Sequence, residues 1–262
     1  MSIPVTSTDL LQQALPGIII GPNFTRSNAI HDIRYVGPLR RWATFNNEAT
    51  ATFQNTNWSP VPLSSSLVNS PTLGPLANEH IRCGDETGLQ GRFDERVGQV
   101  LGAIFDVNNI DLVFGDFKCT TNALNYRKTP DVMIMRPNGS SHVVGEMKTF
   151  WVYDHQLERI VSQFDLGEDN LLRQVLGQIA QYMEDLDLKF GFISTYNETL
   201  FLRQVLFGRT RGLEFSPLIY HDDVYTGQGD VTLRQGMMHL ALCSLVNPRP
   251  DTGLRGVWTV DT

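Results

Sequence analysis

Residues 128–151 read KTPDVMIMRPNGSSHVVGEMKTFW, and this stretch decides how the chain folds. Two runs rich in Val, Ile and Met flank Asn138–Gly139, a dipeptide that strongly favours a β-hairpin. With a two-residue turn at that dipeptide, the numbers of paired residues sum to 277. Asp131 then lies opposite Glu146, and Lys148 projects from the same face as Glu146. The sequence therefore predicts two acids and a lysine side by side on a hairpin.

Both faces of the hairpin are apolar, as expected for strands covered on each side, because its other positions include Val132, Met133, Ile134, Val143 and Val144. Like charges opposite one another destabilise a sheet, and a buried carboxylate without a partner is costly or shifts its pKa. A divalent cation resolves this conflict, because Mg²⁺ is commonly held by one or two carboxylates together with water and phosphate oxygens. Lys148 beside it would orient a water or stabilise charge on a phosphate. The alternative is a surface salt bridge between Glu146 and Lys148, with Asp131 only capping the strand after Pro130.

A further acid can be sought on the preceding helix. Residues 85–105 carry apolar side chains at helical spacing and lead into a predicted strand over 110–117. Because neighbouring strands of a meander run antiparallel, the amino-terminal part of this helix is expected over the acid pair. Glu86 falls about 20° from Phe93 on the sheet-facing side, whereas Glu95 points almost the opposite way. Glu86 is the better candidate, and Glu95 remains the alternative.

The rest of the chain predicts a mixed α/β domain with one central sheet. We expect helices over 155–165, 171–186 and 234–246, and strands over 189–196 and 199–207. The helix over 171–186 places Gln178 and Tyr182 on one face, since they are four residues apart.

Residues 1–78 differ in composition from the rest and are rich in Ser, Thr, Asn and Pro. We interpret them as an amino-terminal extension that is partly irregular, with loop or linker over 55–78. Aromatic residues within 17–53 are expected to pack onto the main domain, which is predicted to span 79–262.

The bulk composition excludes some classes of protein. The chain has 262 residues and a net charge of −7, so it is not a generally basic nucleic-acid coat. It has three widely spaced cysteines and no basic segment before its first apolar stretch. No run of about 18 apolar residues predicts a membrane span. We expect a soluble, intracellular protein of the nucleus or cytoplasm.

Pro130–Asp131 followed by Glu146–Met147–Lys148 resembles the signature of the PD-(D/E)xK nuclease superfamily. The predicted order helix–strand–strand–strand–helix–strand is similar to that of its core, and the resemblance covers about 79–207. The Gln178–Tyr182 segment, QIAQY, resembles the Gln-x-x-x-Tyr motif of the recombination-exonuclease branch. The carboxyl-terminal stretch is similar to uncharacterised fungal nuclease-like domains.

The resemblance implies a restriction-endonuclease-like core and Mg²⁺- or Mn²⁺-dependent hydrolysis of phosphodiester bonds, with DNA favoured as substrate. It implies that Asp131 and Glu146 bind the metal, with the carbonyl of Met147 completing the shell and Glu86 as an additional ligand. Lys148 would act near the attacking water. Gln178 and Tyr182 would help to position the nucleic acid.

An acidic chain needs a local cationic surface to hold a phosphate backbone. Arg127, Lys128 and Arg173 are the basic residues expected to border the cleft. Two rival hypotheses stay open. One is a catalytically inactive nuclease-fold module for binding or scaffolding, and the other is an unrelated α/β domain whose acids lie on the surface.

Overall fold

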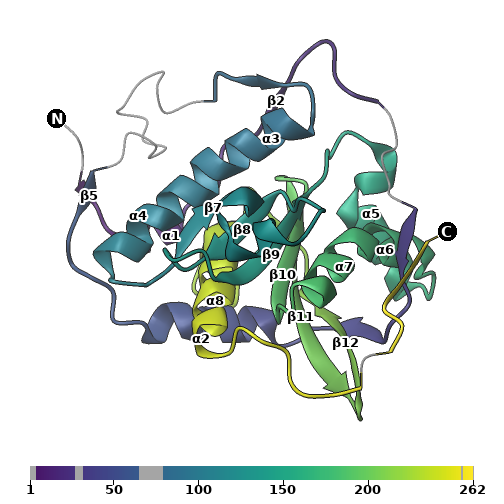
Figure 1. Cartoon of the computed structure of the whole chain (residues 1–262). Helices are drawn as coiled ribbons and strands as arrows, with labels where there is room; N and C mark the ends of the chain where they lie inside the picture. Colours follow the sequence, from purple (N-terminus) through teal and green to yellow (C-terminus); the bar gives the residue numbers. More distant parts are fainter. Residues whose placement is uncertain (1–3, 27–31, 65–78, 255, 262) are drawn as a thin grey trace.

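An eight-stranded mixed sheet forms the middle of the computed structural model, which describes residues 4–26, 32–64, 79–254 and 256–261 (Figure 1). Seven strands follow one another in the order β4-β12-β11-β10-β9-β8-β7, and β13 pairs with β11. The strands are β4 (Leu39–Arg41), β7 (Val113–Gly115), β8 (Val132–Met135), β9 (Ser141–Met147), β10 (Phe190–Ser194), β11 (Glu198–Phe207), β12 (Thr210–Phe215) and β13 (Ile219–Tyr220). The β9–β10 and β12–β4 pairs are parallel, and the other pairs are antiparallel.

Helices cover both faces of this sheet, which confirms the mixed α/β prediction (Figure 1). The first face packs on α2 (Phe45–Asn55), α3 (Glu86–Phe93), a π-helical turn (Asp94–Gly98), α4 (Gln99–Val107) and α8 (Leu233–Val246). The second packs on α5 (Leu157–Asp165), α6 (Asn170–Val175) and α7 (Gly177–Asp185). Ile134 and Val143 belong to the first core, and Met133 and Val144 to the second, because successive strand residues point to opposite faces.

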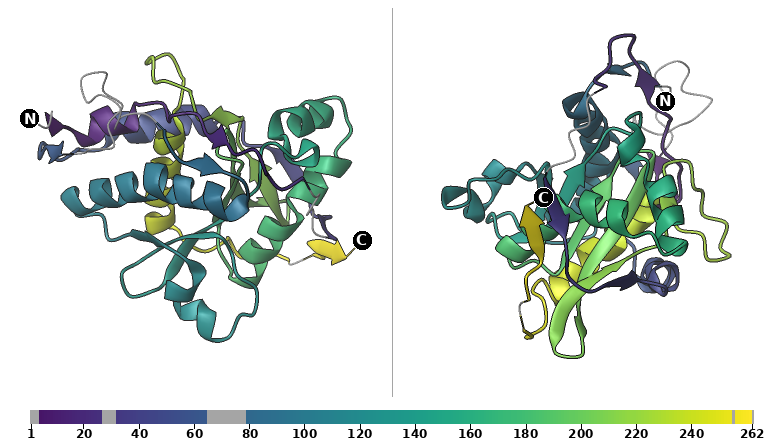
Figure 2. Two further views of the ribbon diagram at one scale, coloured as in Figure 1. Left: turned by 90° about the horizontal axis from the view of Figure 1, so that it is seen from above. Right: turned by 90° about the vertical axis from the view of Figure 1, so that its right-hand side faces the viewer.

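Smaller elements complete the fold. They are α1 (Ser7–Leu11), the strand pairs β1 (Pro4–Val5) with β5 (Leu63–Ser64), β2 (Ile19–Ile20) with β6 (Arg82–Cys83) and β3 (Ile33–Tyr35) with β14 (Thr259–Asp261), and 3-10 turns at Phe117–Cys119, Thr121–Leu124 and Tyr153–His155. Figure 2 shows the carboxyl-terminal strand β14 lying beside β3, close to α6 and α7. Within the described residues, no helix has the length and apolar character needed to cross a membrane.

The turn of the β8–β9 hairpin differs from the predicted one. The Gly139 N–H donates to the Arg136 carbonyl at 2.8 Å, and the Arg136 N–H donates to the Ser140 carbonyl at 2.9 Å. Gly139 has a φ of 84°, so the loop is the three-residue segment 137–139 with its last residue in the left-handed region. The two-residue turn was therefore wrong.

The predicted register of the hairpin nevertheless holds along its paired core. Val132 pairs with Gly145 and Ile134 with Val143, as a sum of 277 requires. A register shift between Ile134 and Met135 compensates for the extra loop residue. Asp131 and Glu146 directly follow the Val132–Gly145 pair at the open end of the hairpin.

The helix predicted over 171–186 is broken into α6 and α7 at Leu176. A Cβ on Gly177 would lie 1.9 Å from the carbonyl oxygen of Ile33. Strand β3 therefore crosses α7 at backbone contact distance, and the glycine is required by this close approach. The prediction of one continuous helix was wrong, and a distant segment docks beside the break.

The amino-terminal segment contributes to the sheet and to its core. Strand β4 adds a parallel edge strand beside β12, and the Phe45 ring stacks on Phe201 with centroids 4.9 Å apart. Trp42, Phe45 and Phe53 are buried, so the expected packing of aromatic residues from 17–53 is confirmed. Of the predicted loop over 55–78, residues 65–78 lie outside the described residues. The domain boundary at residues 78 and 79 stays a prediction.

Candidate functional site

The predicted carboxylates and Lys148 meet where β8 begins and β9 ends. Strand β8 begins there just after Asp131, and β9 ends there with Glu146 and Met147. Helix α3 begins close to this point with Glu86, because the side chain of Asp85 accepts a hydrogen bond from the Gly88 N–H at 2.7 Å and caps it. Helix start and strand ends thereby bring together carboxylates that are far apart in the sequence.

Lys148 lies between two of these carboxylates. Its Nζ is 2.5 Å from Glu146 Oε1 and 3.7 Å from Glu86 Oε2. The Glu146 and Lys148 side chains are 1% and 7% exposed, so their ion pair is buried rather than on the surface. Glu95 instead pairs with Arg92 at the partly exposed side of the helix. The structure thus places Glu86, and not Glu95, beside the predicted pair.

Asp131 is held by two hydrogen bonds from neighbouring elements. Its Oδ2 accepts from the Met147 N–H at 2.8 Å, and its backbone carbonyl accepts from Gln90 Nε2 at 2.5 Å. These contacts fix the start of β8 against the end of β9 and against α3. The Met147 side chain lies in the core, which leaves only its backbone for the predicted role as a ligand.

Glu146 is the most perturbed acid of the group. Burial raises its pKa to about 8 against the opposing attraction of Lys148, and the charges of Asp131 and Glu86 raise it further. Its second oxygen, Oε2, is buried and has no hydrogen-bond partner. One lone pair of a buried carboxylate is therefore left for a cation, a proton or a ligand donor.

The described residues contain no group of three or more His, Cys, Asp or Glu side chains arranged to hold a metal ion. The cationic Lys148 ammonium itself bridges Glu146 and Glu86. Two carboxylates nevertheless suffice for Mg²⁺, which keeps waters and takes phosphate oxygens for its other positions. Glu146 with its unpartnered oxygen and the adjacent Asp131 fit that requirement.

Gln178 and Tyr182 form the pair expected on α7. Gln178 Nε2 donates to the Tyr182 hydroxyl at 2.7 Å, and Gln178 Oε1 has no partner. Burial raises the pKa of Tyr182, and the negative charge of Glu146 adds to this shift. The tyrosine therefore lies within electrostatic reach of the acids.

The basic residues Arg127 and Lys128 lie on the loop that covers the end of α7. Lys128 Nζ is 3.7 Å from Asp185 Oδ2, and Arg127 is exposed beside it. Tyr126 donates its hydroxyl to the same Asp185 at 2.8 Å and packs edge-on against Tyr182, with ring centroids 6.4 Å apart. This loop is thus joined to the Gln178–Tyr182 face.

Arg173 is engaged elsewhere. Its Nε donates to Asp169 Oδ2 at 2.6 Å and its Nη1 donates to the Gly37 carbonyl at 2.8 Å. The guanidinium thereby fastens α6 to the amino-terminal segment. The structure does not bring Arg173 together with the carboxylates.

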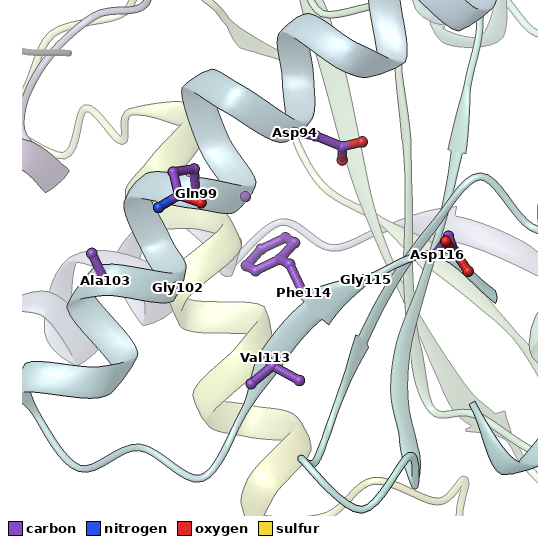
Figure 3. A pocket seen from close by; sticks show the side chains of 9 residues that line it. Asp94, Gln99, Gly102, Ala103, Val113, Phe114, Gly115 and Asp116 are labelled. Atoms are coloured by element: carbon purple, nitrogen blue, oxygen red, sulfur yellow. The ribbon is translucent and has the colours of Figure 1, made fainter. Parts of the chain in front are cut away.

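Two polar residues of the site were not predicted from the sequence. Gln90 and Asp94 follow Glu86 at four-residue spacing, which is the signal that would have placed all three on one helix face. Asp94 and Asp116 line a pocket of about 380 Å³ beside β7, into which the Phe114 ring projects (Figure 3). Partial loss of water raises the pKa of Asp94 to about 6, and the charges of Asp131 and Asp116 contribute.

The chain matches no protein-family model, no curated protein and no solved structure.

Proposed function

We propose that this protein is a Mg²⁺- or Mn²⁺-dependent nuclease that hydrolyses phosphodiester bonds of nucleic acid. The observation that carries the proposal is the buried Glu146 carboxylate, which lies next to Asp131 and Lys148. Its Oε2 atom has no hydrogen-bond partner. An unmet acceptor of this kind is costly unless a cation or donor completes it. The order α3–β7–β8–β9–α–β10 and the PD-(D/E)xK resemblance support the assignment to a restriction-endonuclease-like core.

In this proposal Asp131 and Glu146 hold the metal, with the Met147 carbonyl and Glu86 as further ligands. The bound ion would supply a Lewis acid for the phosphate and lower the pKa of a nearby water. Lys148 keeps its proton, because the negative charges of Glu146 and Glu86 outweigh the burial that opposes its charge and raise its pKa. Its ammonium is thus available to stabilise charge that develops on the phosphate.

The nucleic acid is expected to run past the Gln178–Tyr182 face of α7. The cations at that face are Arg127 and Lys128, which are exposed, whereas Arg173 serves the fold. Resemblance to the recombination-exonuclease branch favours DNA.

A second candidate is a catalytically inactive module that keeps this fold for binding or scaffolding. The Lys148 ammonium bridging Glu146 and Glu86 favours it, since an internal cation neutralises the acids without a metal. The two candidates differ in whether the acids bind a divalent ion. The nuclease requires such an ion next to Lys148 or in its place, whereas the inactive module does not.

Titration calorimetry with Mn²⁺ separates them. We expect the wild type to bind Mn²⁺ and to cleave labelled DNA or RNA. The double variant Asp131→Asn/Glu146→Gln should bind it at least about 100-fold more weakly, because both charged ligands are lost. Glu168→Gln, which neutralises an exposed acid in the loop between α5 and α6, should bind and cleave like the wild type.

Binding without cleavage of single- or double-stranded DNA or RNA would favour the inactive module. Absence of Mn²⁺ binding in the wild type, also with nucleic acid present, would exclude the metal site.

A further inference from the structure

A second pocket lies between α5, the segment that precedes it and the turn that joins β10 to β11. It measures about 550 Å³, and its lining includes Phe150, Gln156, Glu158, Arg159, Asn197 and Glu198. We call it the Phe150 pocket.

The Phe150 pocket is close to the proposed reaction centre. Phe150 follows Lys148 by two residues, so their Cα atoms are at most about 7 Å apart. Asn197 lies in the turn after β10, and β10 pairs with β9 so that Ser194 is next to Met147. The pocket therefore opens at the same sheet edge as Glu146.

The polar groups of the pocket are incompletely satisfied. Asn197 Oδ1 and Arg159 Nε are buried without a hydrogen-bond partner. Gln156 precedes α5 without capping it through its side chain, so its amide is not used by the helix. Glu198 is partly used, because its Oε2 accepts from the Leu157 N–H at 2.7 Å. Acceptors and donors thus remain beside one aromatic ring.

This combination suits a nucleobase better than a phosphate. A half-buried phenylalanine offers a surface on which a base can stack. Amide and carboxylate oxygens accept hydrogen bonds from the exocyclic amino groups of adenine, cytosine and guanine. Glu158 and Glu198 also disfavour an anion in the pocket.

We propose that the Phe150 pocket binds the unpaired base of a nucleotide adjacent to the cleaved phosphodiester, so that the substrate is single-stranded or locally unpaired nucleic acid. This inference rests on the proposed nuclease function. A base inside a duplex is stacked and paired, and it cannot present its face to Phe150 and its edge to Asn197 together. Bases with an exocyclic amino group are expected to be preferred over thymine and uracil.

The test measures KM and kcat with Mn²⁺ on a labelled single-stranded oligonucleotide, whose cleavage position is mapped first with the wild type. A second oligonucleotide carries an abasic nucleotide next to that position. Phe150→Ala should raise KM for the intact strand about tenfold or more, with kcat nearly unchanged. On the abasic strand, the wild type and Phe150→Ala should have the same KM.

Asn197→Ala should weaken the preference for amino-bearing bases. Gln99→Ala removes an exposed amide from the pocket beside β7 and should match the wild type on both strands. Equal cleavage of the abasic strand by Phe150→Ala and the wild type also shows that the variant is folded.

The outcomes separate this inference from the function on which it rests. A wild type that cleaves no nucleic acid would overturn the proposed function. Cleavage with equal KM values for Phe150→Ala and Gln99→Ala on the intact strand would overturn the base pocket alone. A preference for fully paired duplex over single strands would overturn it as well.

Discussion

Glu146 is the last residue but one of β9, whose seven residues are all buried, and it is the residue at which folding and function compete. Lys148 gives it one close charge, yet burial still raises its pKa to about 8. A carboxyl group with a raised pKa holds a proton more readily than a free one, so a proton competes with a metal ion for this group. The spacing of Asp131, Glu146 and Lys148 predicted this neighbourhood. That Glu146 Oε2 lacks a hydrogen-bond partner depends on side-chain packing, which the spacing alone does not specify.

The raised pKa of Glu146 makes the stability of the metal-free protein depend on pH. The folded pKa of about 8 exceeds the ordinary glutamate pKa of 4.5, so protonation stabilises the folded state. That contribution is complete below about pH 4.5 and is lost as pH rises through 8. Relative to Glu146→Gln, the wild type should lose on the order of 5 kcal/mol across this window.

Urea unfolding with a chelator present, at intervals from pH 4.5 to 8.5, measures the difference between the two proteins. Glu168→Gln serves as the control and should follow the wild type throughout. Parallel curves for the wild type and Glu146→Gln would show that the folded state does not raise the pKa of this group.

At the scale of elements, the β8–β9 hairpin has the predicted strand register although its turn was predicted wrongly. The Asn138–Gly139 pair suits a two-residue turn and equally a three-residue loop that ends in a left-handed glycine. The dipeptide alone cannot distinguish them. The register is fixed instead by apolar residues that must face two cores, and the bulge next to Met135 restores it.

No feature of the sequence over 171–186 predicts the break between α6 and α7. The apolar spacing continues across Leu176, and a single glycine inside a helical pattern is tolerated. Only the docking of β3, more than a hundred residues earlier in the chain, makes Gly177 necessary. Contacts of this range leave no periodic pattern in the local sequence.

Gly177→Ala should therefore be strongly destabilising. The added Cβ would meet the Ile33 carbonyl at 1.9 Å, so the backbones of α7 and β3 must separate. We expect a loss of about 3 kcal/mol or more in the free energy of unfolding. Gly102→Ala, whose Cβ would meet nothing within 4 Å, should instead gain up to about 1 kcal/mol.

Both variants can be compared by urea unfolding at one pH. Similar free energies of unfolding for Gly177→Ala and Gly102→Ala would mean that β3 is not held against α7 in solution.

At the scale of the whole molecule, the amino-terminal segment is built into the fold. Arg40 pairs with Glu214 of β12 at 2.7 Å, and the guanidinium of Arg41 lies 4.9 Å from the centre of the Phe215 ring. Composition indicated a partly irregular extension, because a three-residue parallel strand has no recognisable local pattern. The aromatic residues of this segment predicted that it packs onto the main domain, and the structure confirms that packing.

A substitution in this segment tests whether it unfolds together with the main domain. Phe45 is fully buried between α8 and the sheet, and it stacks on Phe201 with centroids 4.9 Å apart. Phe45→Ala should lower the free energy of unfolding by about 3–5 kcal/mol, because it opens a cavity in the common core. Leu124→Ala, at a residue that is 86% exposed, should change it by less than about 0.5 kcal/mol.

The measurement is urea unfolding followed by two probes, tryptophan fluorescence and far-ultraviolet circular dichroism. If residues 1–78 formed a loosely attached extension, Phe45→Ala would leave the transition seen by circular dichroism unchanged. One shared transition, shifted equally in both probes, is expected instead, because Phe45 and Phe201 belong to one core that unfolds cooperatively. The same core packs behind β8 and β9, so the shift would also link the amino-terminal segment to the hairpin that carries Asp131 and Glu146.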